Sequence, residues 1–414
     1  MKTLEIVDIS QRSGGSYRAF KVLQYRGLYN IECYSILLGI HEDRSTYLSA
    51  LQSRCRPIGY AYLRTRFKRS LLSRLHELIS PIEVVYDKVS AKDVDVVIGH
   101  HETIDCIKAA SDISNILNVR KVLVLQLPPF YGNSIRRKKI EDAYMLYIDM
   151  VRRWGDGIGY VLRFLRKEID SITERPYIKT LLNILNSFDV VLAVSKSIEI
   201  DMGFTLGNMV SLKCGIGFDE DEIAFLRSFR GKKSYNAEAK KDLYAVYSAR
   251  LSILKGVVEA LLATSYIKKS LTNFKLIITG YATKRALTII NKLIKHLGLK
   301  DNVVIAGFLP KAEAIKLKGN AKVSIYPSHV DAHPYSVAEA LIMGTPVVGY
   351  RIPALTLNYG DISGLYLVDE GDIEALAQKT LEVFEMKKVK VEEPRICTLN
   401  DVVREEIEVL RCHV

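Results

Sequence analysis

The stretch SHVDAHPYSVAEALIMGTPVV, residues 328–348, combines a loop, a short helix and an apolar strand in one pattern. Pro334 precedes the apolar segment, and Gly344 and Pro346 follow it, which predicts a helix over residues 336–343 and then a strand. Helices that alternate with apolar strands are typical of βαβ units, whose strands form a parallel sheet. None of this local structure requires an acid at Asp331, which indicates a function for that residue.

The same alternation continues along the chain. A first set of predicted strands covers residues 4–9, 31–37, 94–98, 122–127 and 190–194. A second set covers residues 245–248, 275–279, 302–305, 323–326 and 346–349. Because 414 residues exceed what one core usually supports, the two sets predict two similar α/β domains with a junction at about 195–215. Ligands of such sheets bind beyond the carboxyl ends of the strands, so we expect the site in a cleft between the domains.

Cysteine usage and the first residues predict the compartment. The six cysteines are scattered, without a CxxC pair or zinc spacing, which predicts reduced thiols and neither a disulfide framework nor a metal site. Residues 1–10 carry acids where a signal peptide has basic and apolar residues, and no apolar run is long enough to span a membrane. We therefore expect a cytoplasmic protein.

The net charge of +12 lies mostly before residue 196 and is concentrated in two segments. Residues 57–79 combine a basic face with an apolar stripe at helical spacing, and residues 131–180 form a basic, aromatic insertion. Such segments are typical of proteins that attach to an anionic membrane surface from the cytoplasmic side. Ordinary helices packed on the sheet are the alternative. A nucleic-acid-binding protein is a second alternative, although no DNA or RNA motif accompanies the charge.

Three motifs lie at predicted strand ends. Gly14 and Gly15 follow the first strand, where glycines allow a backbone to approach a phosphate or simply make a tight turn. Arg250 and Lys255 follow the first strand of the second set, where two cations can bind a diphosphate or remain solvated surface charges. In the opening stretch, Ser336 and Glu339 have the spacing of a capping box, which would explain Glu339 without any ligand.

The motifs GG, ARLxxxKG, AGFLP and PSxxDxxPxxxxEALxxGTPVV, in this order, together resemble the retaining glycosyltransferases of family 4. This resemblance implies the GT-B fold, in which two Rossmann-like domains with parallel sheets face one another. It assigns residues 1–195 to an acceptor-binding domain with a helical insertion at about 131–180. Residues 196–385 would bind the nucleotide sugar, and residues 386–414 would form a tail helix.

The resemblance also implies roles for single residues. Three would be catalytic: Glu339 would hold the ribose hydroxyls of the donor, Asp331 would contact the transferred sugar, and His100 would lie near its anomeric carbon. The donor-binding set is Gly14, Gly15, Arg250, Lys255, Phe308, Leu309, Tyr335 and Ser336. Within that set, Arg250 and Lys255 would neutralise the diphosphate, and the backbone around residues 307–309 would contact the base. A histidine at a strand end can instead be structural, so His100 has that alternative.

The implied mechanism is electrostatic. It needs no metal ion and no cofactor besides the nucleotide-sugar donor, and the acceptor would be lipid-linked or a glycan. Two departures from the family pattern are Asp331, which is one methylene shorter than the usual glutamate, and His333, which replaces a phenylalanine. They leave a third alternative open, a non-catalytic subunit that binds sugar nucleotides.

Overall fold

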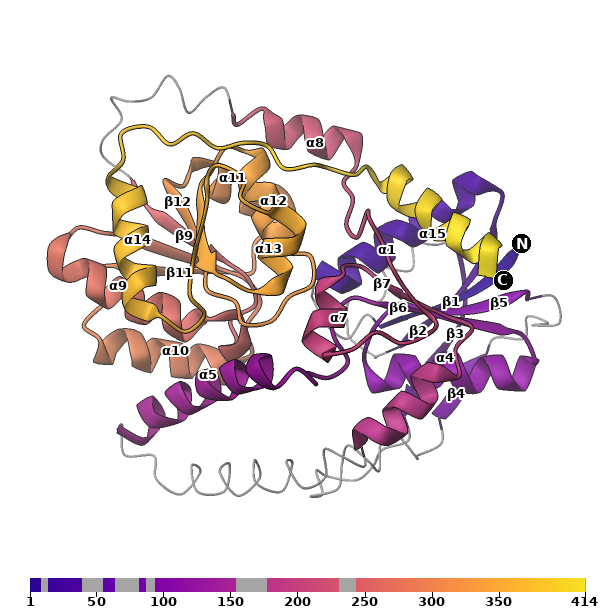
Figure 1. The fold of residues 1–414 in the computed structure, drawn as a ribbon. Helices are drawn as coiled ribbons and strands as arrows, with labels where there is room; N and C mark the ends of the chain where they lie inside the picture. The colour runs from indigo at the N-terminus through magenta and orange to yellow at the C-terminus, as the bar shows by residue number, and fades with distance from the viewer. Residues whose placement is uncertain are drawn as a thin grey trace. The chain divides into compact units, whose positions relative to one another are not determined.

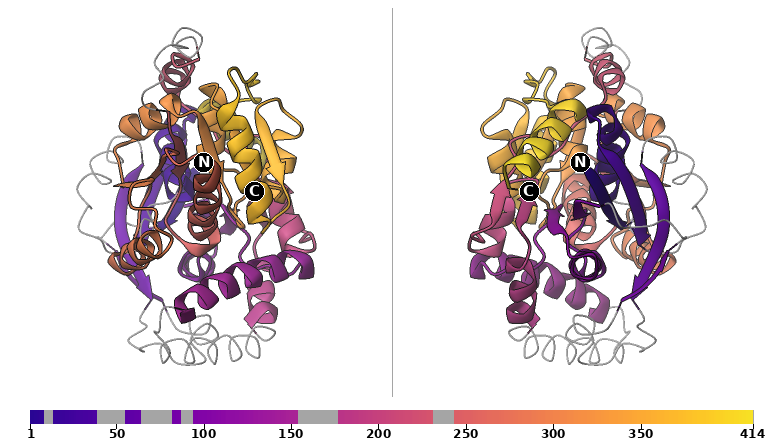
Figure 2. Two further views of the ribbon diagram at one scale, coloured as in Figure 1. Left: turned by 90° about the vertical axis from the view of Figure 1, so that its left-hand side faces the viewer. Right: turned by 90° about the vertical axis from the view of Figure 1, so that its right-hand side faces the viewer.

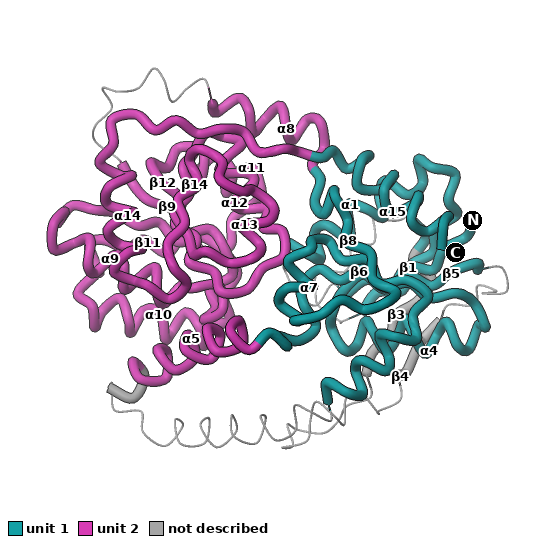
Figure 3. The backbone as a smooth tube through the Cα atoms, viewed as in Figure 1, with its two compact units in different colours: residues 1–133, 151–217, 397–414 teal, residues 134–150, 218–396 magenta. Residues whose placement is uncertain are grey.

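The computed structural model describes residues 1–8, 14–38, 55–63, 82–86, 94–153, 177–230 and 243–413. The chain divides into two compact units (Figure 3). Unit 1 contains Met1–Asn133, Val151–Gly217 and Cys397–Val414, and unit 2 contains Ser134–Met150 and Phe218–Ile396. Both termini therefore belong to unit 1, and they lie close together in each view (Figures 1 and 2).

These boundaries differ from the predicted ones in three places. Ser134–Met150, predicted as part of the first domain, belongs to unit 2. Residues 196–217, predicted as part of the second domain, belong to unit 1, where β8 pairs with β7. Cys397–Val414 returns to unit 1 instead of forming a separate tail. Local hydrophobic patterns do not reveal the first and third differences, because the partners are far away in the sequence.

Unit 1 is built on an eight-stranded sheet with the order β4-β3-β2-β1-β5-β6-β7-β8 (Figure 1). Neighbouring strands are parallel except β3 and β4, which are antiparallel. The strands are β1 (Lys2–Asp8), β2 (Glu32–Leu38), β3 (Arg56–Leu63), β4 (Ile82–Tyr86), β5 (Val96–Gly99), β6 (Arg120–Leu125), β7 (Val190–Ala193) and β8 (Met209–Ser211). The central strands β5 and β7 are buried along their full length, as expected for parallel strands covered on both faces.

The helices of unit 1 include one from the end of the chain. They are α1 (Gly14–Arg26), the 3-10 helix η1 (Gly27–Tyr29), α4 (Ile104–Leu117), α7 (Ser197–Met202) and α15 (Leu399–His413), and residues 177–186 are also helical. Helix α15 packs against α1 through an apolar cluster that contains Val22, Ile31, Val402, Val403 and Ile407. The C-terminal segment is therefore part of the core of unit 1.

Two disulfides contradict the prediction of reduced thiols. Cys33 is bonded to Cys55, and Cys214 is bonded to Cys397, which lies 183 residues later in the sequence. The Cα atoms of these pairs are 4.5 and 5.7 Å apart, within the range that a disulfide requires. The sequence showed no pairing because the fold brings each pair together from separate elements. Cys106 and Cys412 are free.

Unit 2 is built on a six-stranded parallel sheet with the order β11-β10-β9-β12-β13-β14. The strands are β9 (Ala245–Ser248), β10 (Leu276–Thr279), β11 (Val303–Gly307), β12 (Val323–Tyr326), β13 (Val347–Tyr350) and β14 (Leu365–Val368). The helices are α5 (Ser134–Arg153), α8 (Glu220–Arg227), the 3-10 helix η4 (Ile253–Lys255), α9 (Val257–Ser270), α10 (Lys284–His296), α11 (Lys311–Asn320), α12 (Tyr335–Ile342), α13 (Pro353–Tyr359) and α14 (Ile373–Glu385).

Each sheet contains one point at which the strand order reverses. In unit 1 this point lies between β1 and β5, and in unit 2 it lies between β9 and β12. The connections leave the two neighbouring strands in opposite directions there, and ligands of open α/β sheets bind at the carboxyl ends of such strands. The fold class predicted from the sequence, two Rossmann-like α/β domains, is confirmed.

The ten predicted strands all exist, with ends shifted by at most two residues. Strands β3, β4, β8 and β14 were not predicted. Residues 57–63 of the predicted basic helix form part of β3 instead, and residues 64–79 lie outside the described residues. Residues 154–176 of the predicted insertion also lie outside them, whereas residues 134–153 form a helix. Among the helices that the structure describes, none is long and apolar enough to cross a membrane.

Candidate functional site

The carboxyl ends of β9 and β12 carry the site in unit 2. Strand β9 leads to Arg250 and then to η4, which ends with Lys255, while β12 leads into a loop over residues 327–334. Gly256 lets the two connections approach closely, since a Cβ at this position would lie 1.8 Å from the carbonyl oxygen of Pro327. The φ of Gly256 is +74°, which also favours glycine. A backbone hydrogen bond of 2.9 Å from His329 N to Leu254 O completes the contact.

Asp331 lies in this loop and accepts hydrogen bonds from several sides. The Nζ of Lys255 is 2.5 Å from Asp331 Oδ2, and it also donates to the carbonyl oxygen of Val330 at 2.7 Å. The hydroxyl of Tyr326 donates to the same Oδ2. Burial and the neighbouring Asp331 raise the pKa of Tyr326 well above its usual value, so this hydroxyl stays a donor. Two residues that the sequence placed in the donor site, Lys255 and Asp331, are thus joined directly.

Glu339 is buried in α12 between two lysines. Its Oε1 accepts a hydrogen bond of 2.6 Å from Lys311 Nζ, and its Oε2 bonds Lys318 Nζ. Burial, and then the charge of Lys311, lower the pKa of Lys318 well below its usual value. Glu339 therefore provides the counter-charge for a buried lysine, whatever else it binds.

The capping box proposed as an alternative for Ser336 and Glu339 is absent. Helix α12 begins at Tyr335, and its N-cap is Pro334, which has no side chain that could accept a hydrogen bond. Ser336 is the second residue of the helix, where its hydroxyl cannot bond the third amide as an N-cap would. Its Oγ is buried and has no hydrogen-bond partner within the described part of the chain. The carboxylate of Glu339 is instead occupied by the two lysines.

The other donor-binding candidates lie on the same edge of the sheet. Tyr335 begins α12, and its ring packs edge-on against Phe218 with the centroids 5.3 Å apart. Phe308 and Leu309 follow β11, and Phe308 is 58% exposed although it is a large aromatic residue. Gly307, which ends β11, has a φ of +72° and accepts a hydrogen bond from Thr279 Oγ1 at 2.9 Å.

Gly14 and Gly15 begin α1 in unit 1, next to the end of β1. A Cβ at Gly15 would lie 2.9 Å from Cβ of Gln126 and 3.6 Å from Nε2 of His101. The glycine at this position therefore allows the close approach of Gln126. Residues 9–13, which connect β1 to the glycines, lie outside the described part of the chain.

His100 has the contacts of a structural histidine. Its side chain is completely buried, and its Nε2 bonds Glu5 Oε2. Glu5 in turn lies 3.1 Å from Nε of Arg26, so His100 belongs to a buried ionic chain. These contacts favour the structural alternative for His100 over a catalytic role. The histidine beside Gly15 is its neighbour His101, whose Nδ1 lies 3.1 Å from Glu102 Oε2. The sequence Gly99-His100-His101 indicates that a histidine lies at the end of this strand. Only the structure shows that His101, and not His100, faces Gly15.

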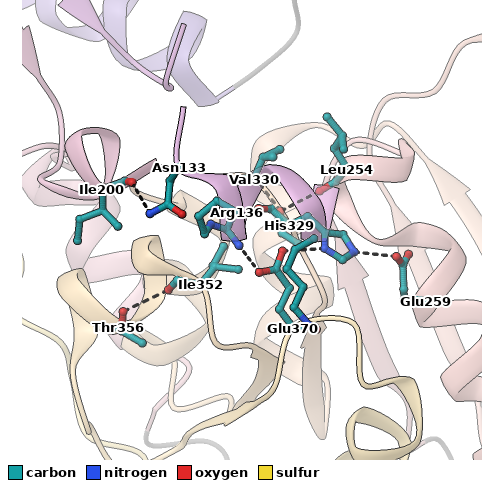
Figure 4. A network of polar contacts seen from close by, with 12 residues as sticks. Asn133, Arg136, Ile200, Leu254, Glu259, His329, Val330, Ile352, Thr356 and Glu370 are labelled. Carbon is teal, nitrogen blue, oxygen red and sulfur yellow. Dashed lines mark hydrogen bonds and ion pairs between the residues drawn. The ribbon is translucent and has the colours of Figure 1, made fainter. Parts of the chain in front are cut away.

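A group of buried charges beside the 327–334 loop was not predicted from the sequence. His329 lies between Glu259 and Glu370, and Arg136 contacts both His329 and Glu370 (Figure 4). These four residues come from four separate parts of the chain, so no local motif joins them. Among the described residues, no group of three or more His, Cys, Asp or Glu has the arrangement of a metal site.

Part of the chain is similar to known glycosyltransferases. Two curated relatives from Streptomyces match part of the chain: the 2-deoxystreptamine N-acetyl-D-glucosaminyltransferase of Streptomyces fradiae is 33% identical over 85 residues, 20% of each chain. The 2-deoxystreptamine glucosyltransferase of Streptomyces kanamyceticus is 25% identical over 167 residues, 40% of this chain and 43% of the relative. The matches thus span less than half of the length of these relatives.

Solved structures resemble the whole chain. The Anabaena HepE structure with UDP and glucose has a TM-score of 0.66 at 14% identity, with 100% of both chains covered. Sucrose-phosphate synthase from Thermosynechococcus elongatus has a TM-score of 0.67 at 12% identity, with 100% of this chain and 98% of that chain covered. At these identities the likeness is one of fold. Residues 230–396, which carry Arg250, Lys255, Asp331 and Glu339, match the family model of glycosyl transferases group 1.

Proposed function

We propose that the protein is a retaining glycosyltransferase that transfers a sugar from a nucleoside-diphosphate sugar to an acceptor hydroxyl. The observation that carries the proposal is the direct contact of Lys255 with Asp331 at the strand-order reversal of unit 2. This contact lies inside the segment that matches group 1 glycosyl transferases. It unites a cation for the diphosphate with an acid for sugar hydroxyls at the place where such sheets bind ligands.

In this proposal, Arg250 and Lys255 neutralise the departing diphosphate, and the first amides of α12 at Tyr335 and Ser336 bind a phosphate oxygen. The hydroxyl of Ser336, which has no hydrogen-bond partner among the described residues, is a further donor in the same turn. Asp331 accepts hydrogen bonds from the sugar, and Glu339 accepts them from the ribose. Phe308 and Leu309 lie beside the base, and the exposed ring of Phe308 offers a surface for it.

The reaction breaks the bond between the anomeric carbon and the diphosphate oxygen and forms a bond from that carbon to the acceptor oxygen. The acceptor proton passes to the departing diphosphate on the same face of the sugar, which retains the configuration. Positive charge near the leaving group stabilises this transition state more than the bound donor. The scheme uses no metal ion and no cofactor besides the donor.

The acceptor that we propose is lipid-linked or a glycan, and it binds to unit 1. The basic sequence of α5 and of residues 57–79 supports an anionic membrane surface as a partner, with the enzyme on the cytoplasmic face. The names of the Streptomyces relatives support a different acceptor, an aminocyclitol. Transfer assays with a polyprenyl-phosphate-linked sugar and with 2-deoxystreptamine distinguish the two.

Calorimetric titration with UDP, GDP and ADP tests the donor site. We expect one nucleotide to bind, and we expect Arg250→Ala to weaken it at least about tenfold because a charge-assisted bond to phosphate is lost. Arg285→Ala, which removes an exposed arginine of α10, should have no effect. Binding of none of the three nucleotides would overturn the proposal. Selective binding of one nucleotide, without turnover of any of its sugar conjugates, would favour the alternative of a non-catalytic subunit that binds sugar nucleotides.

A further inference from the structure

The loop over residues 327–334 is held by side chains from several helices. Asn358 donates to the carbonyl oxygen of Ala332 at 2.6 Å, and the hydroxyl of Tyr359 donates to that of Pro334 at 3.0 Å. Both residues lie on α13. The position of Asp331 is thus set by supports that do not themselves belong to the proposed donor site.

His329 provides the most deeply buried of these supports. Its side chain is 2% exposed, its Nε2 lies 2.7 Å from Oε1 of Glu259, and its Nδ1 lies 2.9 Å from Oε1 of Glu370 (Figure 4). An ionised carboxylate only accepts hydrogen bonds, so both ring nitrogens must carry a proton. The geometry therefore describes an imidazolium between two carboxylates, two residues before Asp331.

Arg136 extends the cluster to α5. Its guanidinium bonds Glu370 and also the carbonyl oxygen of His329, while Lys139 Nζ donates to the carbonyl oxygen of Glu370 at 2.8 Å. The side chains of Arg136 and Glu370 are 7% and 6% exposed. Two carboxylates therefore face one guanidinium and one imidazolium, and the buried charges balance only while His329 is protonated.

Arg136 lies close to the point where the chain passes from unit 1 into unit 2. The chain enters unit 2 at Ser134, so Arg136 is the third residue after the crossing, and it bonds the backbone of the loop that carries Asp331. A bond to the backbone fixes the path of the loop, whereas a bond to a side chain would not. The cluster thus ties the start of α5 to the loop.

We propose that His329, held between Glu259 and Glu370 and braced by Arg136, is a positioning residue that sets the place of Asp331 in the donor site. The expected effect on catalysis rests on the proposed function, whereas the expected effect on the stability of the loop does not. His329 does not touch the donor. It acts through the backbone of the loop, so its loss should impair the sugar-directed step more than the binding of a nucleoside diphosphate.

The protonation of His329 should control this support. Burial lowers the pKa of His329, but the hydrogen bonds and charges of Glu259 and Glu370 outweigh it and raise the pKa to about 9. The groups that face the ring or its partners are Glu259 of α9, Glu370 after β14, Arg136 and Lys139 of α5, and Tyr350 of β13, whose ring centroid lies 5.2 Å away. Loss of the proton leaves one carboxylate facing a ring nitrogen that no longer donates, and the loop should loosen.

Hydrogen exchange of the 327–334 amides tests the structural part without any ligand. After correction for intrinsic exchange, we expect the wild-type loop to exchange at least about tenfold faster near pH 10 than near pH 7, where His329 is charged. In His329→Gln the loop should exchange fast at both values, and His296→Gln, on the exposed surface of α10, should behave as the wild type. A protected, pH-independent loop in His329→Gln would overturn the inference.

The catalytic part is tested with UDP and UDP-glucose as probes. In His329→Gln we expect the Kd of UDP to change less than about threefold, while kcat for release of glucose falls about tenfold or more. If neither probe binds the wild-type protein, the proposed function fails with these probes, whereas the exchange experiment still decides the role of His329.

If His329→Gln does not fold, Arg136→Lys provides the same tests. It keeps the charge but loses the forked geometry, so we expect faster loop exchange with UDP binding retained. Unchanged exchange in Arg136→Lys would overturn the inference.

Discussion

The ammonium nitrogen of Lys255 lies 2.5 Å from Oδ2 of Asp331, although the two residues are 76 positions apart in the sequence. In the proposed mechanism a diphosphate competes with Asp331 for this ammonium. Lys255→Ala should therefore weaken UDP binding by about 1.5–3 kcal/mol, because a charge-assisted hydrogen bond is lost. Calorimetry with Lys300→Ala, an exposed lysine of the same unit, provides the matched control.

Asp331→Asn should impair sugar transfer without weakening the binding of UDP. Removal of the competing anion leaves Lys255 available to phosphate, so we expect UDP to bind as tightly as before or more tightly. Transfer should fall about tenfold or more, because an amide replaces a charged acceptor of sugar hydroxyls. Equal losses of UDP affinity in Asp331→Asn and Lys255→Ala would show that Asp331 supports the phosphate site instead of the sugar.

Glu339 and Lys318 form a buried ion pair, and each side chain is only 4% exposed. Glu339→Gln should lower the free energy of unfolding by about 3–5 kcal/mol, since it leaves Lys318 without its counter-charge. The double variant Glu339→Gln with Lys318→Met removes both charges and should regain most of that loss, as urea unfolding would show. If Glu339 also binds ribose, nucleotide affinity stays low in the stable double variant. Restored affinity would mean that Glu339 acts only as a counter-ion.

The sequence predicted the parts of this site that depend on local order. Arg250, Lys255 and Asp331 follow strand ends, and parallel strands bring such ends to one edge of the sheet. The sequence could not show that Glu339 faces Lys318, nor that Arg136 braces His329, since each contact joins two separate elements and no local pattern pairs them. The adjacent histidines at positions 100 and 101 are both buried, but they have different neighbours: His100 bonds Glu5, and His101 lies beside Gly15 and Glu102. Neighbouring residues point to different sides, and the sequence alone does not show which neighbours each side meets.

In unit 1, the return of α15 depends on buried charges. Glu406 bonds Arg18 at 2.6 Å and Arg26 at 2.9 Å, and Arg26 continues to Glu5. Burial raises the pKa of Glu5, but Arg26 and His100 outweigh this effect and lower the pKa to about 2. Because the pKa of Glu5 is lower in the folded protein than in the unfolded chain, ionised Glu5 stabilises the fold at pH values above its unfolded pKa. This contribution is lost as the pH falls toward 2.

We therefore expect the wild-type protein to lose about 3 kcal/mol of stability through Glu5 between neutral and strongly acidic pH. Glu5→Gln should be less stable at neutral pH and should lose less on acidification, as measured by urea unfolding at several pH values. Glu408→Gln, on the exposed face of α15, is the control. An acid sensitivity of Glu5→Gln equal to that of the wild type would contradict the role given to Glu5.

The disulfide of Cys214 with Cys397 also holds the C-terminal segment in unit 1. Near it, Glu405 accepts hydrogen bonds of 2.7 Å from the backbone amides of Lys213 and Cys214. A link across 183 residues restricts the unfolded chain strongly, by on the order of 5 kcal/mol in the chain-entropy model. Cys397→Ser should therefore lower the unfolding midpoint clearly, whereas Cys412→Ser, which removes an exposed free thiol, should not.

A thiol titration of the denatured, unreduced protein decides whether these bonds form where the protein is made. The structure predicts two reactive thiols, Cys106 and Cys412, out of six cysteines. Six reactive thiols would instead agree with the reduced cytoplasmic protein that the cysteine spacing predicted. Because disulfides are uncommon in a reducing cytosol outside hyperthermophiles, a count of two also restricts the compartment in which the proposed transfer takes place.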